Sequence, residues 1–96
     1  MSNITVVNNA ADSRFEIQRN GDVVGHLDYR TQGNTVDLTH AETDNAVRGE
    51  GIGGKLVQGA LDTIKTEKMS VIATCPFVAS WIEQHEEYQS LLAPRS

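Results

Sequence analysis

The chain has 96 residues, of which 8 are Lys or Arg and 13 are Asp or Glu, and its formal net charge is −5. This length predicts a single domain over residues 1–96 with a modest core, to which a homodimeric partner or a bound cofactor would add stability. The acidic balance argues against a nucleic-acid partner. The N-terminal segment lacks the pattern of a signal peptide, and no run reaches about 20 apolar residues, so we expect no membrane partner and a cytoplasmic location.

An antiparallel meander of four strands is predicted for the first 42 residues. The strand-forming runs are 4–7, 13–19, 23–30 and 35–42, and turn residues separate them. Phe15 and Ile17 alternate with polar side chains, which is typical of a half-buried strand. Asn20 and Gly21 supply the positive φ angles that a tight hairpin needs.

The fourth predicted strand carries two candidate catalytic side chains. Simple alternation places Val36 and Leu38 on one face with His40 and Glu42, and we expect that face to look toward a cleft. His40 is then the candidate general base, and Glu42 is its orienter or a carboxylate that binds an amine. His26, on the preceding strand, is interpreted as an exposed strand residue.

A helix, a strand and a second helix follow the meander. Apolar residues recur at helical spacing from Ile52 to Ile64, and Gly59 within this helix is expected to allow close packing on the sheet. The run at 71–73 is apolar on both faces and predicts a covered strand, parallel to the fourth. The predicted fold is therefore α/β, with the order β-β-β-β-α-β-α and a mixed, mostly antiparallel sheet.

The stretch 48–55 holds four glycines before the helix, and their bare N–H groups can bind a phosphate. The pattern G-x-G-x-x-G from Gly49 fits a dinucleotide fingerprint, but the strand at 70–74 does not end in the acid that would hold the ribose. The pattern G-x-x-x-x-G-K from Gly49 is a P-loop in which Leu56 replaces the required Ser or Thr.

A third pattern, Arg48-x-x-Gly51-x-Gly53, follows the antiparallel strands. In that position it resembles the signature of the GNAT superfamily of acyl-CoA-dependent N-acyltransferases. The segments that extend the likeness to small, single-domain GNAT-like proteins are 38–43, 47–57, 75–79 and 85–88. The second and third segments contain the glycine loop and a Cys-Pro-Phe element.

The resemblance implies acetyl-CoA as the cofactor and a small amine or peptide amine as the acceptor. The backbone groups of Ala41 and Thr43 would meet the pantetheine arm. The N–H groups implied to hold the pyrophosphate are those of Arg48, Gly49, Glu50, Gly51, Ile52, Gly53, Gly54 and Lys55. Two other hypotheses remain open: a CoA-binding regulatory or interaction module without turnover, and an interaction domain without a cofactor.

Two further residues are catalytic candidates through the resemblance. The superfamily usually has a tyrosine acid in the helix after the fifth strand; this chain has Trp81 there, and Tyr88 is the nearest substitute. Cys75 would lie near the thioester, as an acid, as a covalent acyl carrier or only as part of the lining of the site. A small buried residue without a chemical role is an equal alternative. We expect Phe77 and Trp81 in the core, and the spacing of the three histidines indicates no metal site.

Overall fold

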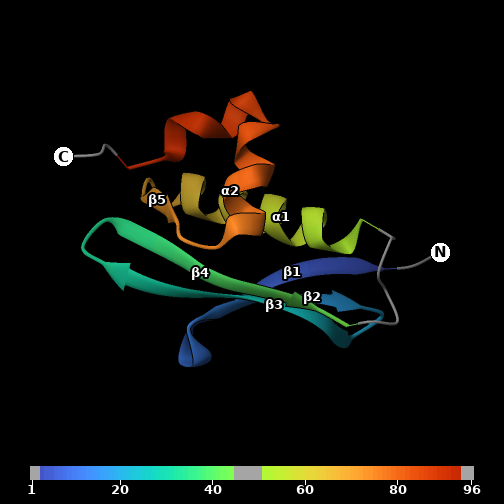
Figure 1. Cartoon of the computed structure of the whole chain (residues 1–96). Helices are drawn as coiled ribbons and strands as arrows, with labels where there is room; N and C mark the ends of the chain where they lie inside the picture. The colour runs from blue at the N-terminus through green and yellow to red at the C-terminus, as the bar shows by residue number, and fades with distance from the viewer. Residues whose placement is uncertain (1–2, 45–50, 94–96) are drawn as a thin grey trace.

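A computed structural model describes residues 3–44 and 51–93, and its strands and helices follow the predicted order (Figure 1). The elements are β1 (Ile4–Asn9), the 3-10 segment η1 (Ala10–Asp12), β2 (Arg14–Arg19), β3 (Asp22–Gln32), β4 (Thr35–Thr43), α1 (Ile52–Thr66), β5 (Ser70–Ala73), α2 (Pro76–Glu83) and the 3-10 segment η3 (Glu86–Leu91). The order β-β-β-β-α-β-α is confirmed, and the two 3-10 segments are additions to it.

All five strands form one sheet in the order β1-β2-β3-β4-β5. The first three pairings are antiparallel, and Asn20 and Gly21 have the predicted positive φ angles, 52° and 89°, in the turn between β2 and β3. β4 and β5 pair in parallel because α1 forms the connection between them. The predicted mixed, mostly antiparallel sheet is thus confirmed.

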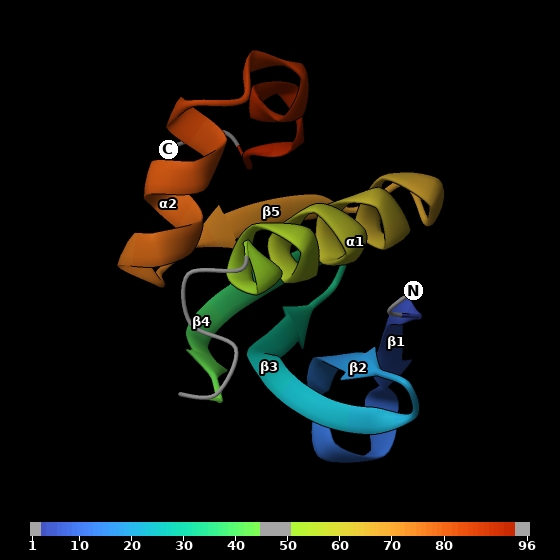
Figure 2. The same cartoon turned by 90° about the vertical axis from the view of Figure 1, so that its right-hand side faces the viewer.

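Both α-helices of the described chain pack on the same face of the sheet (Figures 1 and 2). The buried side chains of α1 are those of the predicted apolar face: Ile52, Leu56, Val57, Ala60, Leu61 and Ile64. A Cβ atom on Gly59 would lie only 2.7 Å from Cβ of Val6 on β1, so the close packing expected at this glycine is confirmed. No helix within 3–44 or 51–93 is long and apolar enough to cross a membrane.

A β-bulge at Thr39 divides β4 into two halves. Asp28 of β3 pairs with His40, but the next residue, Tyr29, pairs with Leu38, so Thr39 has no partner in the register with β3. An extra residue of this kind shifts the alternation of side chains between the two faces of a strand. Residues on either side of Thr39 therefore follow different alternations.

The bulge overturns the predicted placing of His40 and Glu42. Leu38 is fully buried beneath the helices, whereas the side chains of His40 and Glu42 are 60% and 67% exposed. The two residues pair instead with Asp28 and His26 of β3. We call this side of the sheet, opposite the helices, the open face; it carries Glu16, His26, Asp28, His40 and Glu42. The prediction that His40 and Glu42 share a face with Leu38 is wrong, because simple alternation takes no account of a bulge.

The apolar face of α2 also differs in part from the prediction. Val78 and Ile82 are buried, and Trp81 is partly buried against the core, as expected. Phe77, by contrast, is 47% exposed and extends toward the start of α1, where its ring lies beside Gly53. The prediction of a core role is therefore wrong for Phe77.

Candidate functional site

The parallel pairing of β4 with β5 covers only part of β4. It runs from Thr35 to Leu38, and the N–H of Cys75 then donates to the carbonyl of Leu38 at 2.9 Å. β5 ends at Ala73, while β4 continues to Thr43 beside β3 alone. The second half of β4 therefore has an edge that β5 does not cover.

A groove of about 190 Å³ lies along this uncovered edge. Its lining residues come from β4, α1 and α2: Ala41, Glu42, Thr43, Gly53, Leu56 and Phe77. The N–H of Asp44 donates to the carbonyl of Val24 at 2.8 Å, so the Asp44 backbone faces β3. Because peptide groups alternate along a strand, those of Ala41 and Thr43 face the opposite edge, toward the groove.

The start of α1 closes one end of the groove. Gly51 is the N-cap with a φ of 72°, and its carbonyl accepts the N–H of Lys55 at 3.2 Å. The N–H groups before Lys55 have no partner within the helix, as at every helix start. An anion near these groups is stabilised by them and by the helix dipole.

The glycines at the start of α1 differ in what surrounds them. A Cβ atom on Gly51 would have no atom of residues 3–44 or 51–93 within 4 Å, so the left-handed φ of Gly51 accounts for glycine there. A Cβ on Gly53 would lie 3.0 Å from the ring of Phe77, and one on Gly54 would lie 3.3 Å from Nε1 of Trp81. The latter two glycines therefore also allow α2 to approach α1. The predicted contacts at Arg48, Gly49 and Glu50 lie outside the described residues.

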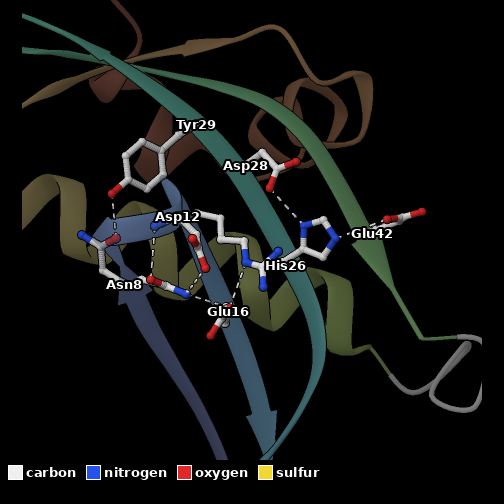
Figure 3. Close-up of polar contacts among 9 residues, drawn as sticks. Asn8, Asp12, Glu16, His26, Asp28, Tyr29 and Glu42 are labelled. Carbon is white, nitrogen blue, oxygen red and sulfur yellow. Dashed lines mark hydrogen bonds and ion pairs between the residues drawn. The ribbon is translucent and has the colours of Figure 1, made fainter.

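On the open face, His26 lies between two carboxylates (Figure 3). Its Nδ1 is 3.1 Å from Oδ1 of Asp28, and its Nε2 is 3.2 Å from Oε2 of Glu42. Nε2 of His40 is 3.9 Å from the same oxygen of Glu42. The sequence analysis predicted roles for His40 and Glu42 but missed His26 and Asp28. Their alternation onto one face was visible; the cross-strand register that places Glu42 opposite His26 was not.

Glu16 is a buried carboxylate on the same face. Its Oε2 accepts hydrogen bonds from Nδ2 of Asn9 at 3.1 Å and from Nε of Arg14 at 2.8 Å. The bond from Asn9, and after it the bond and charge of Arg14, hold the pKa of Glu16 below its ordinary value. The Glu16 carboxylate is therefore held in its charged form, and it lies opposite His26 in the sheet.

Cys75 lies in the hydrophobic core and is only 5% exposed. It is the N-cap of α2, and its carbonyl accepts the N–H of Ala79 at 3.0 Å. Cys75 is not among the residues that line the groove. Its position fits the structural alternative, a small buried residue at a helix start, and a chemical role for the thiol remains a prediction.

The hydroxyl of Tyr88, the candidate acid, binds a carboxylate on α1. It donates to Oδ1 of Asp62 on α1 at 2.7 Å, and this bond, with burial, raises the pKa of Tyr88. Asp62 is six residues beyond Leu56, the last α1 residue in the groove, or about 9 Å along the helix axis. The hydroxyl of Tyr88 thus stabilises the packing of η3 on α1, and its role as an acid stays a prediction.

The aromatic rings beside Tyr88 pack against one another. The rings of Trp81 and His85 stack at 3.7 Å, and Nδ1 of His85 donates to the Trp81 carbonyl at 2.6 Å. Among the described residues, no group of three or more His, Cys, Asp or Glu side chains could hold a metal ion. The candidate site is the groove together with the adjoining open face, where His26 contacts two carboxylates.

A family model matches most of this chain. The model of a family described as GCN5-related N-acetyl-transferase matches residues 14–91. Protein NATD1 of Xenopus tropicalis is 32% identical over 62 residues, which are 62% of this chain and 57% of that protein. Protein NATD1 of Homo sapiens is 33% identical over 61 residues, with coverage of 62% and 54%. The chain thus spans little more than half the length of these curated relatives.

Solved structures share the fold at low sequence identity. A GCN5-like protein from Staphylococcus aureus has a TM-score of 0.73 and 21% identity, over 100% of this chain and 94% of that one. The ribosomal-protein-S18-alanine N-acetyltransferase of Escherichia coli has a TM-score of 0.65 and 11% identity, with coverage of 88% and 76%. A GNAT family acetyltransferase from Brucella melitensis, solved in complex with acetyl-CoA, has a TM-score of 0.56 and 20% identity, with coverage of 75% and 55%.

Proposed function

Because the chain belongs to the GCN5-related N-acetyltransferase family, we propose that it binds acetyl-CoA and transfers the acetyl group to an amine acceptor. The observation that carries this proposal is the groove beside the uncovered edge of β4, which meets the N-terminus of α1. One end of the groove offers helix N–H groups to a phosphate, and its side offers strand backbone and apolar carbon to a thin, extended chain.

The described residues fit such a molecule. Left-handed Gly51 has no atom of the described residues within 4 Å of its missing Cβ, so that part of the chain leaves phosphate oxygens room to approach the N–H groups at the start of α1. The outward peptide groups of Ala41 and Thr43 would pair with the amides of the pantetheine arm. The side chains of Leu56 and Phe77 would pack against its apolar segments.

The roles of general base and orienting group are assigned from the positions of Glu42 and His40 relative to the groove. Bound acetyl-CoA supplies a thioester carbonyl, which a neutral amine can attack. Glu42 lines the groove and is 67% exposed, so we assign it the role of general base that takes a proton from the acceptor. His40, 3.9 Å from Glu42 and outside the groove lining, is then the orienting group, which reverses the order predicted from the sequence.

Titration calorimetry with acetyl-CoA tests the binding site through two matched glycine variants. Gly51 and Gly33 both have a left-handed φ, 72° and 58°, and neither has an atom within 4 Å of an added Cβ. Gly33 lies in the β3–β4 turn, roughly 26 Å along β4 from Ala41. Alanine at either position costs about 1–2 kcal/mol of backbone strain, but only Gly51→Ala should disturb the helix start. We expect an affinity loss of tenfold or more for Gly51→Ala and none for Gly33→Ala.

Mass spectrometry with acetyl-CoA and a panel of primary amines and peptides tests the transfer step. An acetylated amine that forms only with active protein supports the enzyme. Binding of acetyl-CoA without transfer to any amine would instead identify a CoA-binding module. Equal affinities of the wild type and a folded Gly51→Ala variant would contradict the phosphate site at α1.

A further inference from the structure

We propose that His26 and Asp28 form, with Glu42, a proton relay that leads from the groove onto the open face of the sheet. The inference rests on the proposed acetyltransferase function and adds two residues to it. Glu42 is the link, since it lines the groove and also contacts His26 (Figure 3). His26 and Asp28 act through Glu42 and are therefore positioning residues.

The relay depends on which nitrogen of His26 carries the hydrogen of the neutral ring. An ionised carboxylate only accepts, so Asp28 at 3.1 Å favours a hydrogen on Nδ1 and Glu42 at 3.2 Å favours one on Nε2. The relay requires the first arrangement, in which Nδ1 donates to Asp28 and Nε2 faces a Glu42 that has taken a proton from the acceptor. With one further proton, the imidazolium donates to both carboxylates; without it, Nε2 holds a lone pair that can accept from Glu42.

The bulge in β4 brings these three groups together. In the register of β3 with β4, His26 lies opposite Glu42, and Asp28 lies opposite His40. Because of the unpaired Thr39, this half of β4 presents Glu42 to the open face while its backbone edge borders the groove. Glu42 therefore lies where the groove and the open face adjoin, with its carboxylate at His26.

The surroundings of His26 complete the charge arrangement. Its own strand contributes Asp28, and β4 contributes Glu42 and, with ring centroids 6.4 Å apart, His40. β2 contributes Glu16, which pairs with Arg14 and lies opposite His26 in the β2–β3 register. The side chain of His26 is 23% exposed, so a proton on its ring can pass to solvent.

The proposed steps balance in protons and electrons. The acceptor enters as an ammonium, R–NH₃⁺, and gives one proton to the carboxylate of Glu42, which passes it to Nε2 of His26. The neutral R–NH₂ then forms an N–C bond with the thioester carbon, the C–S bond breaks, and the sulfur keeps that electron pair. The thiolate takes the proton that the nitrogen loses on becoming an amide. The imidazolium of His26 returns its proton to solvent.

Steady-state kinetics on His26→Gln test the relay. We expect kcat/KM to fall about 100-fold at neutral pH while the Kd of acetyl-CoA is unchanged. The pH at which kcat/KM rises should also move, whereas a merely structural loss would lower the rate equally at every pH. The control is His85→Gln, the same change at a histidine that stacks on the ring of Trp81, and it should keep wild-type kinetics. Wild-type kinetics in His26→Gln would overturn the relay, whereas a wild type inactive on every amine would overturn the proposed function.

Nitrogen-15 NMR of the His26 ring tests the relay without any turnover. We expect the neutral ring to carry its hydrogen on Nδ1 in the wild type, and to lose this preference in Asp28→Asn. His85 serves as an internal reference in both spectra. A neutral His26 with its hydrogen on Nε2 could not accept a proton from Glu42, and this result would overturn the relay even if the protein is an active transferase.

Discussion

The two faces of the sheet differ in burial and in the chemistry of their side chains. The face under α1 and α2 is apolar and closed: Ile17, Leu27 and Leu38 are fully buried there. The open face carries charged and hydrogen-bonded side chains, from Glu16 across His26 to Glu42 (Figure 3). Burial of apolar surface is the main source of folding free energy, whereas exposed ion pairs contribute little. The difference indicates that one face holds the fold together and the other is free to carry chemistry.

The side chains of β4 change faces at the bulge: Leu38, before Thr39, points into the core, whereas His40, after it, points to the open face. Before the bulge, its side chains enter the core and its backbone pairs with two strands. After the bulge, His40 and Glu42 point to the open face and one backbone edge borders the groove. A single unpaired residue thus places two exposed polar side chains on a strand whose first half is part of the core.

The largest expected effect comes from a deletion in the covered half of β4. Leu38→Ala removes a side chain with no exposed surface and should lower the free energy of unfolding by about 2–5 kcal/mol. His40→Ala, two residues beyond and on the open face, should change it by less than about 0.5 kcal/mol. Urea unfolding of both variants measures the contrast. Similar losses in the two would contradict the division of β4 by the bulge.

A smaller effect is expected where α1 touches the sheet. Gly59→Ala would place a Cβ 2.7 Å from Val6, and the overpacking, offset in part by better helix propensity, should cost about 1 kcal/mol. The double variant with Val6→Ala provides the control, because it restores room for the added methyl group. Thermal unfolding should show the double variant to be more stable than the sum of the two single changes. Strict additivity would show that this contact does not limit the approach of α1.

The smallest expected effect is on the open face and depends on pH. The pKa of Glu16 is lowered in the folded state, so its carboxylate adds stability above its unfolded pKa, about 4.3, and this contribution is lost as pH falls through the lower folded value. Glu16→Gln should therefore cost at most about 1 kcal/mol at pH 7, and the difference from wild type should shrink as the pH falls below about 4.3. Urea unfolding across this range measures it, with Glu83→Gln as an exposed control. A difference that grows toward low pH would contradict the assigned shift.

Much of the fold could be predicted because local patterns agree with it. The apolar positions of α1 from Ile52 to Ile64 are the buried ones, and the turn at Asn20 and Gly21 has the predicted φ angles. Periodicity and turn chemistry are properties of neighbouring residues, so a single sequence contains them. The described part of the glycine stretch, from Gly51 onward, was likewise placed correctly at the start of a helix, where Gly51 is the N-cap.

The side-chain assignments at the site were less predictable. Tyr88 was a candidate acid from its place in the sequence, but its hydroxyl binds Asp62, a residue 26 positions away. Phe77 was expected in the core and instead lines the groove beside Gly53. Both outcomes depend on how α2 and η3 dock on α1, and residue spacing within one element does not contain that information.

The sequence by itself determined the order of strands and helices, the apolar face of α1 and the presence of a glycine-lined helix start. Only the tertiary structure decided which polar side chains meet on the open face beside the groove. The register of β3 with β4 brings His26 to Glu42, and the bulge at Thr39 decides the face on which they meet. The physical reason is that alternation is a local property of a strand, whereas register and bulges depend on the pairing of two strands.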